Sequence, residues 1–471
     1  MKRRMISSFE EAEQYLNDTP KFTTKHSIEA TREFLEKMGS PDKSMKIIHV
    51  AGTNGKGSTC AYLTSILREA GFHTALFTSP HLVDICERFS IDGSDMSHED
   101  FLESFNYIYN MLDWEALAKD EGYHPSYFEF LFFMAMHYFS KKKVEWCVLE
   151  TGLGGLLDAT NSVHHKEAAV ITRIGLDHME YLGETIYEIA GQKAGIIEKG
   201  APLIYNDYVP EASRAIVEAF NRINFSENNE NEYENVYHKV CEKNNEKNEL
   251  KYAVGDNLLL MCENKSETVA FSITDGYYKG VCVCLDTVAA YQTENAMLAI
   301  RTIEATGLCE IINAETLTAA LKKCHWAGRM EEIIHNVFID GAHNPDGIRA
   351  FLETVSRDGL DKSRRSLLFG VVADKNFYRM LEELVESDLF SEMTITPLHT
   401  KRSADISQLR EALAKYDGLT VNIAEDPEMG LREMISSRGN KDDRIIYVAG
   451  SLYLVGEIKK AFTDEATACL I

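Results

Sequence analysis

One stretch of the chain decides how its fold is read: Lys46-Ile47-Ile48-His49-Val50-Ala51-Gly52-Thr53-Asn54-Gly55-Lys56-Gly57-Ser58-Thr59. Its apolar start predicts a buried strand, its glycines a turn, and its end the first turn of a helix. Glycines let a phosphate approach the backbone amides, and Lys56 supplies a positive charge for the outer phosphates. A hydroxyl from Ser58 or Thr59 would lie near a bound magnesium ion. We therefore predict that this turn binds nucleotide phosphates.

The turn departs from the common phosphate loop G-x-x-x-x-G-K-[ST] in two places. Gly52 stands three residues before Gly55 rather than five, and Gly57 separates Lys56 from Ser58. The plain alternative is an ordinary strand-to-helix turn. The strand before the turn, the lysine within it and the amphipathic segment after it favour phosphate binding.

Composition restricts the class of protein. The 471 residues carry a net charge of −25 and 45% hydrophobic residues, which is typical of a globular chain with buried cores. General binding to nucleic acid or anionic membranes is not expected, so an anionic substrate would need a locally basic pocket. The ten cysteines contain no C-x-x-C pair, and the chain has neither a signal-peptide pattern nor an apolar run of roughly 18 residues. We expect a cytoplasmic monomer.

Strands alternate with helices along most of the chain, which predicts an α/β fold with mostly parallel sheets. We expect an N-terminal ATP-binding domain over residues 1–326 and a smaller Rossmann-like domain over residues 327–471. A polar, exposed excursion is expected at 225–250, and three short strands within 257–285. The remaining expected strands are 46–51, 74–78, 146–149, 168–175, 202–205, 336–340, 366–372, 392–396, 420–424 and 444–449.

Polar side chains follow the expected strands, where the crevice of a parallel sheet lies. Glu150 has the position of a magnesium ligand, and Ser79 could add an oxygen; a solvated acid and a turn serine are the alternatives. His178 could bind a cation as neutral imidazole, although a structural role is more common, and Asp177 is expected to cap a helix or a turn. Lys193 lies in an apolar helix, where the residues alone favour a surface lysine over a buried amine.

The second domain offers a further group of polar residues. The segment Asp340-Gly341-Ala342-His343-Asn344-Pro345 places an acid, an imidazole and an amide after a strand, although it also fits a capping turn. Arg329, just past the expected boundary, could reach a phosphate across the cleft, or could be a surface arginine.

Together these segments resemble folylpolyglutamate synthases, which belong to the Mur ligase superfamily and in bacteria are often dihydrofolate synthases as well. Gly57 agrees with this family, whereas the cell-wall Mur ligases usually have threonine there. The resemblance spans about residues 9 to 460. Its ordered motifs are G-T-N-G-K-G-S (52–58), S-P-H (79–81), E-T-G-L-G-G-L-L-D-A-T-N (150–161), D-H-M-E-Y-L-G (177–183), G-Q-K-A-G-I (191–196), G-R-M-E (328–331), D-G-A-H-N-P (340–345) and G-S-L-Y-L-V-G-E (450–457).

The resemblance implies an enzyme that uses ATP to join L-glutamate to a folate or dihydropteroate through an acyl phosphate. It implies two Mg²⁺ ions, one held by Ser79 and Glu150 and one by His178, and carbamylation of Lys193. It also implies that the site closes when the two domains come together. The remaining implied roles are phosphate binding by Gly52, Thr53, Asn54, Gly55, Lys56, Gly57 and Ser58, adenine binding near Asn295, phosphate contacts from Arg329 and His343, and a ribose contact from Asp340.

Two residues depart from the family pattern. Leu156 stands where the family frequently has arginine, and Asn376 stands where many relatives have a second acid. The sequence leaves open whether the first glutamate is added, the chain is extended, or both; we expect chain extension, with both activities as an open alternative. Other readings are a Mur-type cell-wall precursor ligase, a phosphate-loop kinase and a catalytically silent nucleotide-binding protein.

Overall fold

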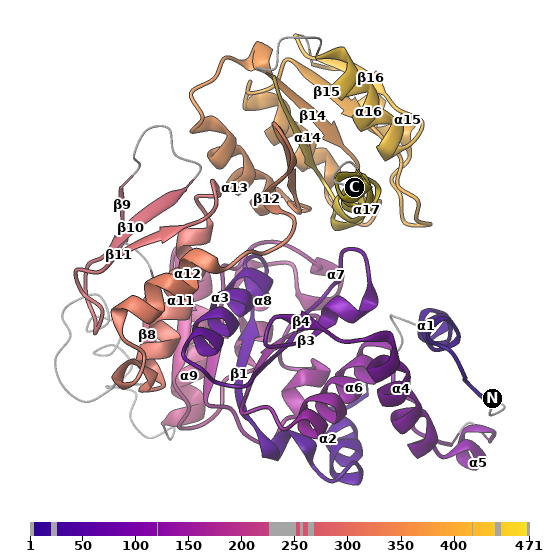
Figure 1. The fold of residues 1–471 in the computed structure, drawn as a ribbon, viewed down its shortest axis with the longest axis vertical. Coiled ribbons are helices and arrows are strands. Elements are labelled where there is room, and N and C mark those ends of the chain that lie inside the picture. The colour runs from indigo at the N-terminus through magenta and orange to yellow at the C-terminus, as the bar shows by residue number, and fades with distance from the viewer. Residues whose placement is uncertain are drawn as a thin grey trace.

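The computed structural model shows two α/β domains, one above the other in Figure 1. The excursion expected at 225–250 lies outside the described residues except for its first member. The structure describes residues 4–19, 26–119, 121–225, 251–254, 258–261, 268–416, 418–438 and 444–468.

The N-terminal domain is built on an eight-stranded sheet of order β4-β3-β2-β5-β1-β6-β7-β8. The strands from β2 to β8 in this order run parallel, and β3 and β4 add an antiparallel edge. The strands are β1 (Lys46–Ala51), β2 (Thr74–Phe77), β3 (Phe89–Ile91), β4 (Ser94–Asp95), β5 (Trp146–Glu150), β6 (Ala168–Ile171), β7 (Leu203–Asn206) and β8 (Lys251–Val254).

Helices cover both faces of this sheet (Figure 1). Because neighbouring residues of a strand point to opposite faces, β1 contributes Ile47 to one core and Ile48 and Val50 to another. The helices are α1 (Phe9–Asp18), α2 (Ile28–Lys37), α3 (Lys56–Glu69), α4 (His98–Met111), α5 (Trp114–Leu117), α6 (Tyr127–Lys142), α7 (Met179–Leu182), α8 (Ile186–Ala194), α9 (Pro210–Asn224), α11 (Gln292–Ala305) and α12 (Ala314–Lys323).

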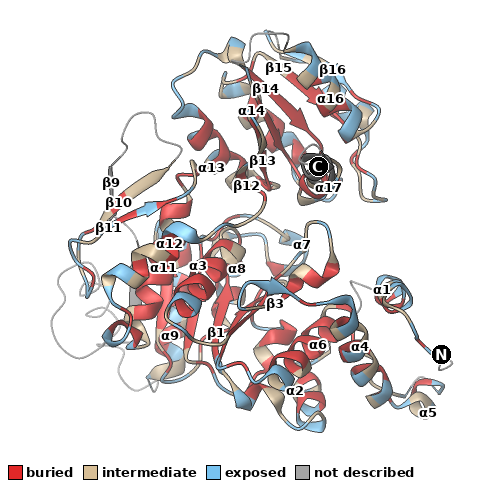
Figure 2. Ribbon diagram, in the orientation of Figure 1, coloured by how far each residue is buried: buried red, intermediate tan, exposed pale blue. Residues whose placement is uncertain are grey.

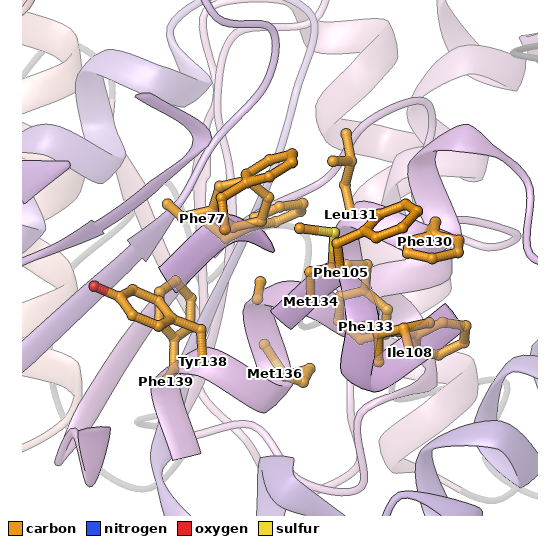
Figure 3. Packing of buried hydrophobic residues seen from close by; sticks show 14 of the residues in the cluster. Phe77, Phe105, Ile108, Phe130, Leu131, Phe133, Met134, Met136, Tyr138 and Phe139 are labelled. Carbon is orange, nitrogen blue, oxygen red and sulfur yellow. The ribbon is translucent and has the colours of Figure 1, made fainter. Parts of the chain in front are cut away.

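Helix α6 is apolar around most of its circumference, and most of its residues are buried (Figure 2). It belongs to the core that contains Ile47 of β1, which we call the first core. Figure 3 shows its aromatic side chains against Phe105 and Ile108 of α4 and Phe77 of β2. A capping box between Ser126 and Glu129 fixes its start. This burial of α6 explains why its sequence has no polar face. No helix within the described residues has the length and hydropathy needed to span a bilayer.

The three short strands expected within 257–285 are confirmed. They form an antiparallel sheet of order β11-β10-β9 beside the N-terminal domain. Phe271 and Val283 from this small sheet belong to the same buried cluster as residues of α11 and α12. The strands are β9 (Leu258–Met261), β10 (Val269–Ile273) and β11 (Cys282–Leu285).

The C-terminal domain has a six-stranded sheet of order β12-β13-β17-β14-β15-β16, parallel except for β12. The expected α/β class with mostly parallel sheets is therefore confirmed, and the boundary at 326/327 stays a prediction. Its elements are β12 (Arg329–Ile334), β13 (Val337–Asp340), β14 (Arg365–Phe369), β15 (Glu392–Ile395), β16 (Thr420–Ile423), β17 (Ile445–Ala449), α13 (Pro345–Ser356), α14 (Phe377–Glu386), α15 (Ile406–Leu413), α16 (Pro427–Ser437) and α17 (Leu452–Ala468).

Strand β6 ends at Ile171 and is shorter than the expected strand 168–175, because Arg173 and Gly175 form hydrogen bonds with the glycine-rich turn. The backbone amide of Thr53 donates to the carbonyl of Arg173 at 3.0 Å, and the amide of Gly175 donates to the Thr53 hydroxyl at 3.1 Å. The chain after Ile171 therefore becomes a loop that braces the turn.

Replacement of Phe133 by alanine tests the first core. Phe133 is fully buried, and its ring centre lies 4.5 Å from that of Phe34. Because Phe133→Ala removes a large ring and leaves a cavity, we expect the free energy of unfolding of the N-terminal domain to fall by about 3–5 kcal/mol in denaturant titrations. Ile311→Ala, at a side chain that is 67% exposed, should change it by less than about 0.5 kcal/mol. Equal effects would contradict the assignment of this core.

Candidate active site

The glycine-rich turn joins β1 to α3 in a conformation that suits an anion. Gly55 has φ +91° and precedes α3 without a capping side chain, so the first amides of this helix remain available. Gly52 has φ +153°, and a Cβ atom there would lie 1.8 Å from the Thr172 hydroxyl. That hydroxyl donates to the carbonyl of Asn54 at 2.7 Å. The turn is thus held open toward the helix N-terminus.

The lysine and hydroxyl residues of this segment are placed for a phosphate and a cation. The Lys56 ammonium donates to the carbonyls of Gly52 at 3.1 Å and Thr53 at 3.3 Å, so it folds back over the turn. The hydroxyls of Ser58 and Thr59 are buried and have no hydrogen-bond partner among the described residues. Buried hydroxyls are normally paired, so the Ser58 hydroxyl, which lines the cavity, fits a site that takes a ligand or a metal, whereas Thr59 does not line the cavity.

Glu150 lies at the carboxyl end of β5, next to Val50 of β1. Its side chain is buried and accepts hydrogen bonds from the Thr78 hydroxyl and, at 3.1 Å, from the Ser79 amide. Burial raises the pKa of Glu150, and the positive charge of Lys56 opposes this shift. A cation would be favoured beside this desolvated acid.

His178 and Lys193 approach the same turn from the next loop and helix. Burial lowers the pKa of His178 to about 4, so its imidazole is neutral at pH 7 and could bind a metal. The ammonium of Lys193 donates to the carbonyl of Gly52 at 2.7 Å, and only 4% of the residue is exposed. The surface position that the helix pattern alone favoured for Lys193 is therefore wrong.

The C-terminal domain places Asp340 and His343 opposite the turn. The Asp340 carboxylate is buried and accepts hydrogen bonds from the Tyr291 hydroxyl at 2.5 Å and from the amides of Met330 and Ala342. Burial raises the pKa of Asp340. Burial lowers the pKa of His343 to about 4, so this imidazole is also neutral at pH 7.

Asp177 connects the two domains. Its carboxylate forms a 2.5 Å ion pair with Lys375, and each side chain is only 9% exposed. Its carboxylate also accepts from the His178 amide at 2.9 Å and from Asn344 at 3.1 Å. Asn344 in turn exchanges two amide hydrogen bonds, of 3.0 and 3.1 Å, with Asn54 of the glycine-rich turn. Helix α7 begins after His178 without a side-chain cap, so Asp177 does not cap this helix.

A cavity of about 740 Å³ lies between the domains, and most of the site residues predicted from the sequence line it, whereas Thr59 and Asn344 do not. Sequence reasoning did not find the apolar wall formed by Phe128, Leu153 and Tyr181, nor the buried cation Arg88. The predicted residues that line the cavity are Gly52, Thr53, Asn54, Gly55, Lys56, Gly57, Ser58, Ser79, Glu150, His178, Lys193, Asn295, Arg329, Asp340 and His343.

The unusual residues of the sequence have structural explanations outside the cavity chemistry. A Cβ atom on Gly57 would lie 2.9 Å from the Trp326 ring, so the residue after the lysine must stay small here. Leu156 is 46% exposed and does not line the cavity. Asn376 caps α14 by accepting from the Arg379 amide at 3.3 Å. Neither Leu156 nor Asn376 lines the cavity.

Comparison with known proteins defines the class. Residues 124–302 match the Mur ligase middle domain, and residues 328–452 match the Mur ligase glutamate ligase domain. The chain is 32% identical over 466 residues to the dihydrofolate synthase/folylpolyglutamate synthase of Bacillus subtilis, an alignment covering 97% of this chain and 99% of the relative. The chain belongs to the dihydrofolate synthase/folylpolyglutamate synthase family.

Solved structures of this family have the same fold. The folylpolyglutamate synthase of Mycobacterium tuberculosis complexed with ADP and AMPPCP matches with a TM-score of 0.80 and 25% identity, over 96% of this chain and 98% of that chain. The folylpolyglutamate synthase of Thermotoga maritima matches with a TM-score of 0.74 and 27% identity, over 97% of both chains.

The ion pair between the domains can be tested by removing its acid. Asp177→Asn leaves the buried Lys375 without a carboxylate partner. We therefore expect the closed arrangement of the domains to be destabilised by about 3–5 kcal/mol relative to the open one. Small-angle X-ray scattering should then show a larger radius of gyration. The double variant Asp177→Asn/Lys375→Met should recover part of the loss, since it removes both charges.

A surface pair in the C-terminal domain supplies the control. Lys362 pairs with Asp388, whose side chain is 76% exposed, so Asp388→Asn should cost no more than about 1 kcal/mol and leave the scattering unchanged. An unchanged radius of gyration for Asp177→Asn would show that the ion pair does not hold the domains together.

Proposed function

We propose that this protein is an ATP-dependent ligase that joins L-glutamate to folates. The observation that carries the proposal is the arrangement of the interdomain cavity in a chain of this family. A phosphate-binding turn and a buried acid line one side of it, and Arg329 and His343 line the other. Amide formation from a carboxylate needs such a site, because phosphate transfer mainly requires charge neutralisation and positioning.

In the first step, a carboxylate oxygen of the folate attacks the γ-phosphorus of ATP. The bond between this phosphorus and the oxygen bridging to the β-phosphate breaks, and ADP leaves with the electron pair. Lys56 and the first amides of α3 neutralise the charge that develops on the phosphates. Arg329 would add a positive charge from the C-terminal domain, and we propose that Asn295, which lies against Gly55 of the turn, contacts the adenine.

In the second step, the neutral amino group of glutamate attacks the acyl carbon of the resulting acyl phosphate. The tetrahedral intermediate collapses, the carbon–oxygen bond to the phosphate breaks, and the nitrogen loses a proton as the amide forms. Inorganic phosphate leaves with the electron pair. Asp177 and Lys375 keep the domains closed around the acyl phosphate, which protects it from water.

We also propose that Ser79 and Glu150 hold one Mg²⁺ ion and His178 a second. The unpaired buried hydroxyl of Ser58, the desolvated acid and the neutral imidazole are the features that fit these ions. The metal would supply positive charge to the phosphate oxygens. Carbamylation of Lys193, in which the amine adds to carbon dioxide and releases a proton, would place an anionic oxygen pair beside them.

Chain extension on a reduced folate is the proposed main reaction, with dihydropteroate as a second acceptor. We further propose that the boundary lies at 326/327 and that the protein acts as a cytoplasmic monomer. A phosphate-loop kinase is disfavoured because it gives no role to the second domain. A cell-wall precursor ligase is disfavoured by Gly57, which packs against Trp326.

The assay combines purified protein, ATP, Mg²⁺ and labelled glutamate with either tetrahydrofolate or dihydropteroate. We expect ADP release matched by glutamate incorporation. Lys56→Ala should lower kcat by roughly 10²–10³-fold, because it removes a charge that stabilises the transition state. Lys119→Ala, at an exposed lysine, is the matched control and should leave kcat unchanged. If ADP release and glutamate incorporation are both absent with either acceptor, the proposed function is refuted. Full activity of Lys56→Ala would refute the phosphate-binding role of this lysine.

A further inference from the structure

Arg88 is a buried cation in the cavity wall that the reaction described above does not use. It ends the short helix η2 (Ile85–Arg88), which follows Ser79-Pro80-His81, and only 6% of it is exposed. Its Nε donates to the Nδ1 atom of His81 at 2.9 Å, and its guanidinium lies 5.8 Å from the ring centre of Tyr127. These contacts fix the side chain, and neither of them is to a carboxylate.

No carboxylate forms an ion pair with Arg88 in the part of the chain that the structure describes. The neighbouring acid Glu87 is occupied, since it accepts from the backbone amides of three preceding residues. Burial lowers the pKa of Arg88, while the Tyr127 phenol and the carboxylates of Glu150 and Glu87 oppose this shift. A guanidinium nevertheless keeps its proton in proteins, so a full positive charge faces the cavity.

Two other cations near the cavity have carboxylate partners: Arg173 pairs with Glu294 at 3.0 Å, and Lys375 pairs with Asp177. Lys56 lies over the glycine-rich turn, and Arg329 donates to the carbonyl of Gly328 at 2.9 Å next to the buried acid Asp340. A buried charge without a partner is costly for a folded protein. A bound anion would remove this cost at Arg88.

The position of Arg88 indicates which anion this is. Tyr127 belongs to α6 and is followed by Phe128 of the apolar cavity wall, so Arg88 adjoins the part of the cavity that suits an organic substrate. The phosphates have their own cations on the turn and in the C-terminal domain. Folates and glutamate each bring a carboxylate that does not react, and a guanidinium matches a carboxylate through two parallel hydrogen bonds.

We propose that Arg88 binds a non-reacting substrate carboxylate, either that of the folate's terminal glutamate or one of the incoming glutamate. This inference rests on the proposed function. Arg88 positions the substrate and takes no part in the transfer of phosphate. Its loss should therefore weaken substrate binding more than it slows the chemical steps.

Steady-state kinetics of Arg88→Gln and Arg88→Lys test this assignment with the full-length enzyme. Arg88→Gln should raise one KM by about 10- to 100-fold, as expected for the loss of hydrogen bonds to a charged group, with a much smaller change in kcat. Arg88→Lys keeps the positive charge but cannot form two parallel hydrogen bonds to a carboxylate, so its KM should lie between those of the wild type and Arg88→Gln. A higher KM for tetrahydrofolate assigns the acceptor carboxylate, and a higher KM for glutamate assigns the incoming one. Unchanged KM values for both, beside an active wild type, would overturn the inference.

Thermal unfolding separates binding from a structural role. Arg88→Gln removes an unpaired buried charge, so its Tm should equal or exceed that of the wild type. The control is Arg365→Lys, because Arg365 is equally buried but pairs with Asp358 outside the cavity. It should lower the Tm and leave both KM values unchanged. A lower Tm for Arg88→Gln with unchanged KM values would show that Arg88 has a structural role instead. If the wild-type protein has no ligase activity, the proposed function is refuted, and the inference about Arg88 is refuted as well.

Discussion

Electrostatic repulsion is the constraint on which the site depends, because anionic phosphates must meet anionic carboxylates within a chain of net charge −25. The overall field of such a protein repels these substrates. The cavity overcomes this locally by gathering positive groups from both domains: Lys56 and the start of α3 from one, and Arg329 from the other. Buried Arg88 adds a further charge on the side of the apolar wall. In a desolvated cavity these charges act more strongly than they would in water.

The same constraint explains why the site is divided between two domains. A cavity that was always closed could not admit ATP, folate and glutamate or release the product. The contacts across the cleft are polar: the Asp177–Lys375 ion pair and the double amide hydrogen bond between Asn54 and Asn344. Since Asn54 belongs to the glycine-rich turn, this turn is itself part of the contact between the two domains.

Local sequence patterns predicted much of this structure. The features that they did not predict depend on contacts between residues far apart in the sequence. Buried strands such as β1 and β5 are continuous apolar runs, so they and the polar residues at their ends could be found from the sequence. Strand β12 was missed because it is an edge strand with charged residues and an irregular register. Asp177 and Lys375 are 198 residues apart, and no local pattern shows that they pair. Arg88 lacks a motif, and only its burial in the cavity identifies it.

In the reaction that we propose, the folate carboxylate is activated by phosphate transfer in this cavity. Isotope transfer tests it most directly: the acceptor carboxylate is labelled with ¹⁸O, and the inorganic phosphate released during glutamate addition is examined by ³¹P NMR. We predict that each turnover moves a single ¹⁸O atom from the carboxylate into the phosphate, because the carbon–oxygen bond to the phosphate breaks after the amine attacks. Unlabelled phosphate, or label found in AMP, would contradict it.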